Sequence, residues 1–228
     1  MAVSGDNVWA VGETYGHYLS NALVLRRVGG RWYVVPTETP AYSGLYGIAI
    51  TGGGAVWADG TTWNPGKDHG FVLRWNGTAW KPVATPSLGA NAALYGLAAG
   101  PDGALWAVGI DNNSNFTAYT ATSMLWNGKT WRKVPIGPLP HDSDLENVTF
   151  VPGGTAWAVG NAGPSTVSLR WTGRAWIRIA NPEQTGATSS WLYQVAAISP
   201  DYAWGVGYTF IGGLEETLIL HWNGKTWS

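Results

Sequence analysis

Short stretches of the chain alternate apolar residues with small or polar ones, and Gly, Asn and Pro separate these stretches. The clearest case is the phrase VWAVG, which contains Trp9 and Val11 and recurs with small changes at Trp57, Trp106, Trp157 and Trp204. Alternation with a period of two predicts a β-strand, and no stretch shows the periodicity and caps of a helix. We expect the Trp and Val side chains of this strand to fill the space between packed sheets.

Two further phrases recur in the same order. One reads RRVGGRW from Arg26, RWNGTAW from Arg74, LWNGKTW from Leu125, RWTGRAW from Arg170 and HWNGKTW from His221. Three of the five copies have an Asn-Gly pair between apolar runs, which predicts a tight hairpin because both residues accept a positive φ. The other reads LYGIAI from Leu45, LYGLAA from Leu94, LENVTF from Leu145 and LYQVAA from Leu192. Together the three phrases predict four short antiparallel strands in each unit.

The spacing of the units predicts the architecture. The tryptophans of the VWAVG phrase are 48, 49, 51 and 47 residues apart, and repeats of roughly 20–50 residues are typical of solenoids, propellers and arrays. Four antiparallel strands at this spacing predict an all-β protein, a five-bladed β-propeller of four-stranded antiparallel blades. We expect a single domain over residues 1–228, with units of about 1–40, 41–89, 90–140, 141–187 and 188–228.

The repeat is incomplete at its ends. The first unit begins at the VWAVG strand, so we expect the first blade to lack its inner strand, and the last unit ends as its fourth strand begins. An uncovered edge invites strand pairing. Self-association through the incomplete blade is therefore one expected interaction.

Composition narrows the classes of function. Only 12% of the residues are charged and the net charge is −1, so no basic field is present to attract nucleic acid. No apolar run is long enough to span a bilayer, and we expect no membrane partner. The absence of cysteine excludes disulfides and thiolate metal sites. No signal peptide follows Met1, so the location stays open, and a secreted or cell-surface protein fits the composition.

The hairpin phrase resembles the Asp-box, or BNR repeat, of sialidase-like propellers, which reads roughly Ser/Thr-x-Asp-x-Gly-x-Thr-Trp. Gly224, Thr226 and Trp227 match this motif, whereas Trp222 stands where the Asp is expected. The whole unit is also similar to the photosystem II assembly factor and its bacterial relatives. The resemblance covers nearly the whole chain and implies a propeller in which the motif fixes a turn.

The same resemblance does not imply sialidase activity. In that family an arginine triad and a Tyr–Glu pair lie on the inner strands. In this chain the inner strands contain no arginine and offer Tyr46, Tyr95, Glu146 and Tyr193.

Function is expected where the units differ. The segments that join the second and third strands vary from unit to unit and should share one face, and binding residues concentrate on loops held by a rigid scaffold. These segments place aromatic rings beside amides and carboxylates, a combination that suits sugars and protein surfaces alike. We expect a non-catalytic, lectin-like glycan-binding module. Its candidate ligand-binding residues are Trp63, Tyr18, Tyr119, Trp191, Asp59 and Glu146.

Two of these candidates break the repeat. Asp59 stands where other units carry Val, and Glu146 stands where they carry Tyr. A buried carboxylate needs a partner, and Arg74 is the nearest candidate for Asp59. The alternatives are a structural or protein-interaction scaffold, natural or engineered, and a glycosidase that uses Asp59 with Glu146 as its carboxylate pair.

Metal sites are weakly indicated. The oxygens of His141–Glu146, a segment with three carboxylates, could hold calcium, but the segment lacks the glycine spacing of a known loop. The four histidines have no zinc spacing. We therefore predict neither a metal nor a cofactor.

Overall fold

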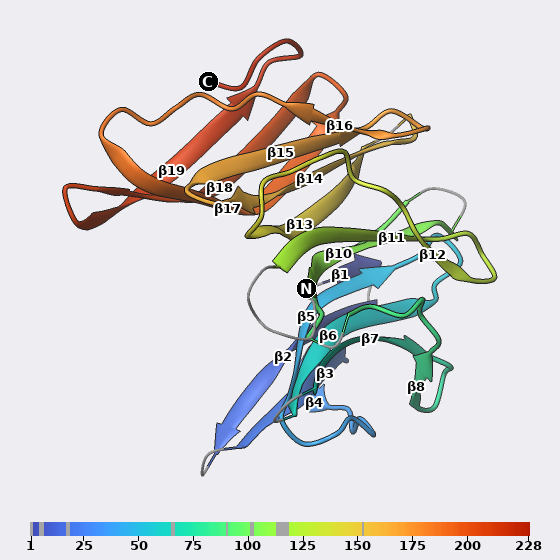
Figure 1. The fold of residues 1–228 in the computed structure, drawn as a ribbon. Coiled ribbons are helices and arrows are strands. Elements are labelled where there is room, and N and C mark those ends of the chain that lie inside the picture. Colours follow the sequence, from blue (N-terminus) through green and yellow to red (C-terminus); the bar gives the residue numbers. More distant parts are fainter. Residues whose placement is uncertain are drawn as a thin grey trace.

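The computed structural model describes residues 2–4, 7–16, 19–64, 67–89, 91–100, 103–112, 119–151 and 153–228. The chain folds into five antiparallel sheets that follow one another in sequence (Figure 1). Within each sheet the strands are joined in chain order, so every sheet is a simple meander. No helix in the described ranges is long and apolar enough to cross a membrane.

Four sheets have four strands each. The first consists of β1 (Ala2–Ser4), β2 (Asn7–Gly16), β3 (Leu19–Val28) and β4 (Arg31–Val34). The second consists of β5 (Ser43–Ile50), β6 (Val56–Asn64), β7 (Lys67–Trp75) and β8 (Trp80–Val83). The third consists of β9 (Ala93–Ala99), β10 (Leu105–Asn112), β11 (Tyr119–Trp126) and β12 (Trp131–Lys133). The fourth consists of β13 (Ser143–Val151), β14 (Thr155–Ala162), β15 (Ser165–Trp171) and β16 (Trp176–Ile179).

The fifth sheet has three strands, β17 (Ala187–Ser199), β18 (Tyr202–Ile211) and β19 (Leu214–Trp222). Its fourth strand is reduced to a single bridge between Trp222 and Trp227.

The prediction that the first blade lacks an inner strand is wrong. Ala2–Ser4 pairs with β2 as β1, with Ala2 opposite Trp9 and Ser4 opposite Asn7. The segment does not carry the LYGIAI phrase, but backbone pairing depends on extended geometry and free amide and carbonyl groups rather than on one side-chain phrase. Because β1 covers only the first residues of β2, the inner edge of the first sheet remains shorter than in the other sheets.

Each of the other four inner strands contains a β-bulge at the same position of the repeat. In the second sheet Leu45 pairs with Gly60 and Gly47 pairs with Asp59, so Tyr46 is left without an opposite residue. The same displacement leaves out Tyr95, Glu146 and Tyr193. A bulge re-aims the extra side chain and bends the strand locally.

The glycine of the VWAVG phrase exists because of this bulge. A Cβ at Gly60 would lie 2.0 Å from the carbonyl oxygen of Gly44, and a Cβ at Gly109 would lie 2.0 Å from that of Ala93. In the first sheet no bulged strand faces Gly12, and a Cβ there would meet nothing within 4 Å. The repeated glycine is therefore a packing requirement of the bulge in the neighbouring strand.

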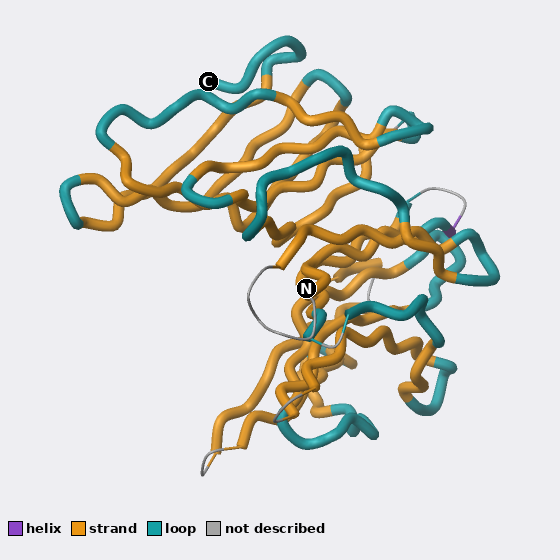
Figure 2. The backbone as a smooth tube through the Cα atoms, in the orientation of Figure 1, coloured by secondary structure: helices purple, strands orange, loops and turns teal. Residues whose placement is uncertain are grey.

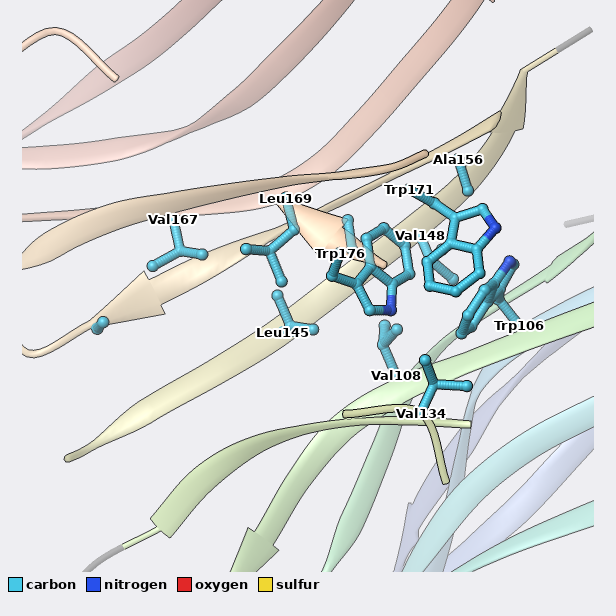
Figure 3. Packing of buried hydrophobic residues seen from close by; sticks show 12 residues of the cluster. Trp106, Val108, Val134, Leu145, Val148, Ala156, Val167, Leu169, Trp171 and Trp176 are labelled. Atoms are coloured by element: carbon cyan, nitrogen blue, oxygen red, sulfur yellow. The ribbon is translucent and has the colours of Figure 1, made fainter. Parts of the chain in front are cut away.

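Tryptophan triads hold successive sheets together, as the alternation of the VWAVG strand predicts. Trp106 of the third sheet is 1% exposed and packs on Trp171 and Trp176 of the fourth, with ring centroids 4.9 and 4.8 Å away (Figure 3). Equivalent triads join the first sheet to the second, the second to the third, and the fourth to the fifth. Each interface thus buries one Trp of a middle strand under two Trp of the next hairpin.

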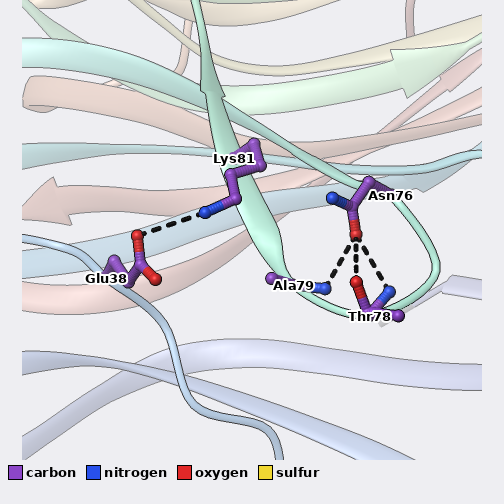
Figure 4. Close-up of polar contacts among 5 residues, drawn as sticks. All are labelled: Glu38, Asn76, Thr78, Ala79 and Lys81. Atoms are coloured by element: carbon purple, nitrogen blue, oxygen red, sulfur yellow. Dashed lines mark hydrogen bonds and ion pairs between the residues drawn. The ribbon is translucent and has the colours of Figure 1, made fainter.

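The Asn of the hairpin phrase acts through its side chain. Asn76 Oδ1 accepts hydrogen bonds from the backbone N–H of Thr78 at 2.9 Å and of Ala79 at 2.8 Å, and from the Thr78 hydroxyl at 3.0 Å (Figure 4). Gly77 adopts a φ of 105°, whereas Asn76 is not among the described residues with positive φ. The signal for a turn was correct, but only the glycine uses the left-handed conformation.

The five sheets form an open arc. The first sheet and the fifth lie at opposite ends of the molecule (Figures 1 and 2). In the described part of the chain, the strands of the first sheet pack against the second sheet and not extensively against the fifth.

Candidate functional site

The four bulged residues form a row across four consecutive sheets. We call this set the bulge row, and it consists of Tyr46 (β5), Tyr95 (β9), Glu146 (β13) and Tyr193 (β17). The inner strands that carry these residues pack against one another in sequence. Since bulges are over-represented beside active sites, where they re-aim a side chain, the bulge row is the natural starting point for a site.

An aromatic and acidic cluster surrounds the second-sheet end of the row. The Tyr46 ring lies 5.7 Å from that of Tyr95 and 6.1 Å from that of Trp63, both edge to face. A Cβ at Gly44 would lie 3.0 Å from both Glu13 Oε2 and a Trp63 ring carbon, so both side chains lie close over that glycine. Glu13 comes from the first sheet, where the hydroxyl groups of Tyr15 and Ser20 donate hydrogen bonds to its carboxylate.

Glu146 is the acidic member of the row. Its carboxyl is partly buried, and burial followed by the charge of Asp144 raises its pKa to about 7. Burial is the main cause of the raised pKa of Tyr46 and of Tyr119, and a hydrogen bond with Tyr208 is the main cause at Tyr193. The negative charge of Glu146 makes a smaller contribution to the raised pKa of all three. These tyrosines belong to three different sheets, so the charge of Glu146 acts across sheet boundaries.

Asp144 is the second acid of this region. It accepts a hydrogen bond from the backbone N–H of Asn161 at 3.1 Å, which lowers its pKa, but burial dominates and raises the pKa to about 6. Both Asp144 and Asp142 act on Tyr119, at the start of β11. The structure therefore brings the predicted residues Tyr119 and Glu146 into one electrostatic group, together with Asp144.

The fifth sheet contributes a block of aromatic rings. Trp191 stacks on Tyr208 with ring centroids 5.0 Å apart and an angle of 26°, and Tyr193 lies 5.4 Å from Tyr208. Tyr193 remains 42% exposed and Tyr46 39% exposed. A partly exposed tyrosine is thus accessible at both ends of the bulge row.

Two clefts lie between neighbouring sheets, and neither is lined by a residue of the bulge row. One of about 490 Å³ separates the fourth sheet from the fifth, and one of about 410 Å³ separates the third from the fourth. Each is formed by the start of a third strand, the end of a fourth strand and the connection to the next sheet. They are equivalent positions of the repeat, but polar residues such as Arg178 and Glu183 line the first, whereas the Pro-rich segment 135–139 lines the second.

Asp59 does not belong to this surface. It is fully buried, and neither carboxylate oxygen has a hydrogen-bond partner of ordinary geometry, although the Gly47 and Asp59 amides oppose the rise in its pKa. Burial raises that pKa to about 7. The expected pairing with Arg74 is wrong, because the Arg74 guanidinium lies over the Trp57 ring, 5.2 Å from its centroid. A buried carboxyl cannot contact a sugar, so the structure removes Asp59 from the predicted site and from the predicted carboxylate pair.

The remaining candidates divide as follows. Trp63, Tyr119, Trp191 and Glu146 lie on or beside the bulge row, while Tyr18 lies outside the described residues. The variable segment around Trp63 continues as paired strand, with Trp63 opposite Asp68.

Tyr46, Tyr95 and Tyr193 were predicted to lie on the inner strands but were not among the predicted ligand-binding residues. The sequence does contain a signal for them. A Tyr follows the Leu of the inner-strand phrase in three units, and the VWAVG phrase of the next strand ends in Gly in every unit, so the two together mark the bulge. Among the described residues, which include His141–Glu146, no group of three His, Asp or Glu is placed to hold a metal ion.

No protein-family model matches the chain, and no curated protein matches it significantly. The BNR resemblance therefore stays a prediction. Solved structures do share the fold. An ulvan lyase of a polysaccharide lyase family, bound to a GlcA–sulfated Rha disaccharide unit, has a TM-score of 0.60 at 13% identity, covering 96% of this chain and 62% of its own.

Two further structures of this fold are an α-L-arabinanase of Penicillium chrysogenum with arabinobiose and a Hadza microbial sialidase. The arabinanase has a TM-score of 0.62 at 13% identity, covering 96% of this chain and 72% of its own. The sialidase has a TM-score of 0.58 at 13% identity, covering 90% of this chain and 53% of its own. This chain thus spans less than two thirds of the lyase and of the sialidase. The fold they share with it is consistent with a β-propeller.

These structures correct one prediction. The sequence led us to expect a protein that is not an enzyme, yet a lyase, a sialidase and an arabinanase have this fold. Absence of the known catalytic motifs therefore does not exclude catalysis by this chain.

Proposed function

We propose that this protein recognises a neutral glycan across the bulge row, with the five sheets acting as five blades of one domain. The observation that carries the proposal is the bulge itself. At one position of four consecutive repeats it leaves Tyr46, Tyr95, Glu146 and Tyr193 out of the strand pairing, and the rings of Tyr46 and Tyr95 then lie 5.7 Å apart across two sheets.

The chemistry of the row suits a sugar. Aromatic rings pack on the apolar faces of sugars, and phenol and carboxyl groups hydrogen-bond their hydroxyls. Tyr46 and Tyr193 keep their phenolic protons at neutral pH, since the ordinary pKa of tyrosine is about 10 and theirs are raised further, so each can both donate and accept. Trp63 and Trp191 extend the aromatic surface at its two ends.

The charge of the row favours a neutral ligand. The groups that act on Tyr46 and Tyr119 are carboxyl groups and other tyrosines, and the charged groups among them are negative. Like charges repel in a partly desolvated site. A uronate, sialate or sulfate group would lie near Glu146 and Asp144, whose pKa values of about 7 and about 6 leave part of their negative charge at neutral pH, so an uncharged glycan is the better fit.

The test is a glycan array followed by calorimetry with the purified chain. We expect binding to a subset of neutral glycans, reduced at least about tenfold, or about 1.4 kcal/mol, in Trp63→Ala and in Tyr193→Ala. Tyr33→Ala is the matched control, because Tyr33 is 52% exposed on the outer strand β4. No glycan binding, or equal losses in all three variants, would contradict the proposal and favour an interaction scaffold.

A second function is supported by the two acids. Glu146 and Asp144 have raised pKa values of about 7 and about 6, so near neutral pH a protonated carboxyl lies beside the proposed glycan. A carboxylic acid in this state can donate a proton to the glycosidic oxygen as general acid while a water molecule adds to the anomeric carbon, so that the C–O bond breaks, the departing sugar keeps the donated proton and the water proton passes to solvent. We propose Glu146 for this role because it belongs to the bulge row.

Release of reducing ends from glycans that bind on the array measures this activity. A general acid must be protonated, so the rate should fall as pH rises through about 7. Glu146→Gln should abolish turnover while binding persists. Binding without any product from the wild-type chain would leave recognition as the function and remove the catalytic role.

A further inference from the structure

The outer face of the fifth sheet exposes an apolar surface that the other sheets bury. We call it the terminal face, and it consists of Trp204, Val206, Ile198 and Ile219, which are 41%, 40%, 73% and 56% exposed. Trp204 keeps one covered side, where the His221 ring stacks on it at 4.4 Å. The Tyr202 ring meets Trp204 edge to face at 6.3 Å, and in the described part of the chain no other sheet packs extensively against this side of β18 and β19.

The repeat shows what this face is built to contact. The equivalent residues of the fourth sheet are Trp157, Val159, Val151 and Ser168, which are 0%, 0%, 1% and 0% exposed. Trp157 is buried by Trp222 and Trp227 of the fifth sheet, at 5.1 and 5.2 Å. The terminal face therefore has the composition of an inter-sheet interface and lacks the hairpin that would complete it.

The matching hairpin is exposed at the other end of the chain. Trp32, in the β3–β4 hairpin, occupies the position of the buried Trp80, Trp131, Trp176 and Trp227, yet it is 45% exposed. Arg27 stands at the position of the other hairpin Trp and pairs with Trp32 across the strands. A guanidinium over a Trp face is an attraction that this protein already uses, for example Arg74 over Trp57.

We propose that the terminal face of one copy binds the β3–β4 hairpin of a second copy, head to tail. Both halves of an interface that occurs four times within the chain are open, and they lie at opposite ends of the arc (Figure 1). Trp204 is the anchor on one side and Trp32 on the other. Because the two surfaces differ, the contact is heterologous and produces a ring or an open filament rather than a closed symmetric dimer.

Complementation between two variants tests this directly. Sedimentation velocity over a wide concentration range should show the wild-type chain forming dimers and larger species. Trp204→Glu and Trp32→Glu should each weaken self-association at least about tenfold, as loss of a buried Trp anchor does at interfaces. Mixed in equal amounts, the two variants should form a dimer that does not grow, since each supplies the intact half that the other lacks.

Tyr33→Glu is the matched control. Tyr33 neighbours Trp32 and is 52% exposed, but it points to the other side of the strand, so its association should equal that of the wild type. Near-UV circular dichroism checks that each variant is folded. A wild-type chain that is monomeric at every concentration, or variants that fail to complement while folded, would overturn the proposal.

Discussion

Asp59 allows the cost of one buried charge to be measured against a reference inside the same chain. Asp59 lies on β6, opposite Gly47 of β5. At the equivalent position of the third sheet, Val108 of β10 lies opposite Gly96 of β9. Both Asp59 and Val108 are fully buried. The Asp59→Val change therefore installs a pair that this fold already accommodates.

The magnitude follows from the pKa. Burial raises the pKa of Asp59 from 3.8 to about 7, so the folded protein keeps a proton that the unfolded chain releases near pH 4. Between these pH values the folded state binds more protons, and stability falls as pH rises. Each tenfold difference in proton affinity is worth about 1.4 kcal/mol, so the penalty is about 2 kcal/mol at pH 5 and about 4 kcal/mol at pH 7 and above.

Urea denaturation followed by tryptophan fluorescence at pH 5 and pH 7 measures this effect. Asp59→Val should be more stable than the wild type, and its advantage should grow by about 2 kcal/mol from pH 5 to pH 7. The reciprocal Val108→Asp should lose stability and gain the same pH dependence. The other titrating acids, Asp144 and Glu146, are common to all variants and cancel in the comparison.

Two results would refute this reasoning. One is an equal pH dependence in the wild type and Asp59→Val, which would mean that Asp59 does not titrate between pH 5 and pH 7. The other is a variant that is less stable than the wild type at pH 7, which would mean that a partner stabilises the buried carboxylate.

Three further predictions concern the scaffold. Trp106→Ala should lower the free energy of unfolding by about 3–5 kcal/mol, because it empties the centre of a triad, and thermal and urea unfolding would measure this loss. Gly109→Ala should cost about 1–3 kcal/mol by the same assays, since its Cβ would press on the bulge carbonyl, whereas Gly12→Ala should be close to neutral. Asn76→Ala should cost about 1 kcal/mol by removing the acceptor of the turn, and a loss near zero would show that Gly77 alone sets that turn.

The repeated phrases were sufficient to predict the sheets and their interfaces. Alternation places Trp57 and Trp106 on the buried side of their strands. The Gly of positive φ in each hairpin phrase lets the chain reverse direction within a few residues and form the next antiparallel strand. These features are local, because strand periodicity and turn geometry depend on residues a few positions apart. The number of strands at each end was less predictable, since Ala2–Ser4 pairs without carrying any phrase of the repeat.

The tertiary structure decided the site. A bulge is a relation between two strands, so the sequence of one strand does not show that Tyr46 leaves the pairing or that Gly60 makes room for the Gly44 carbonyl of the bulged strand. Burial likewise depends on the neighbouring sheet, which is why Asp59 resembled a ligand-binding residue and proved to be interior. The same dependence leaves Trp204 exposed although its phrase is that of the buried tryptophans, because burial needs a neighbouring sheet and no strand of the described chain covers that face.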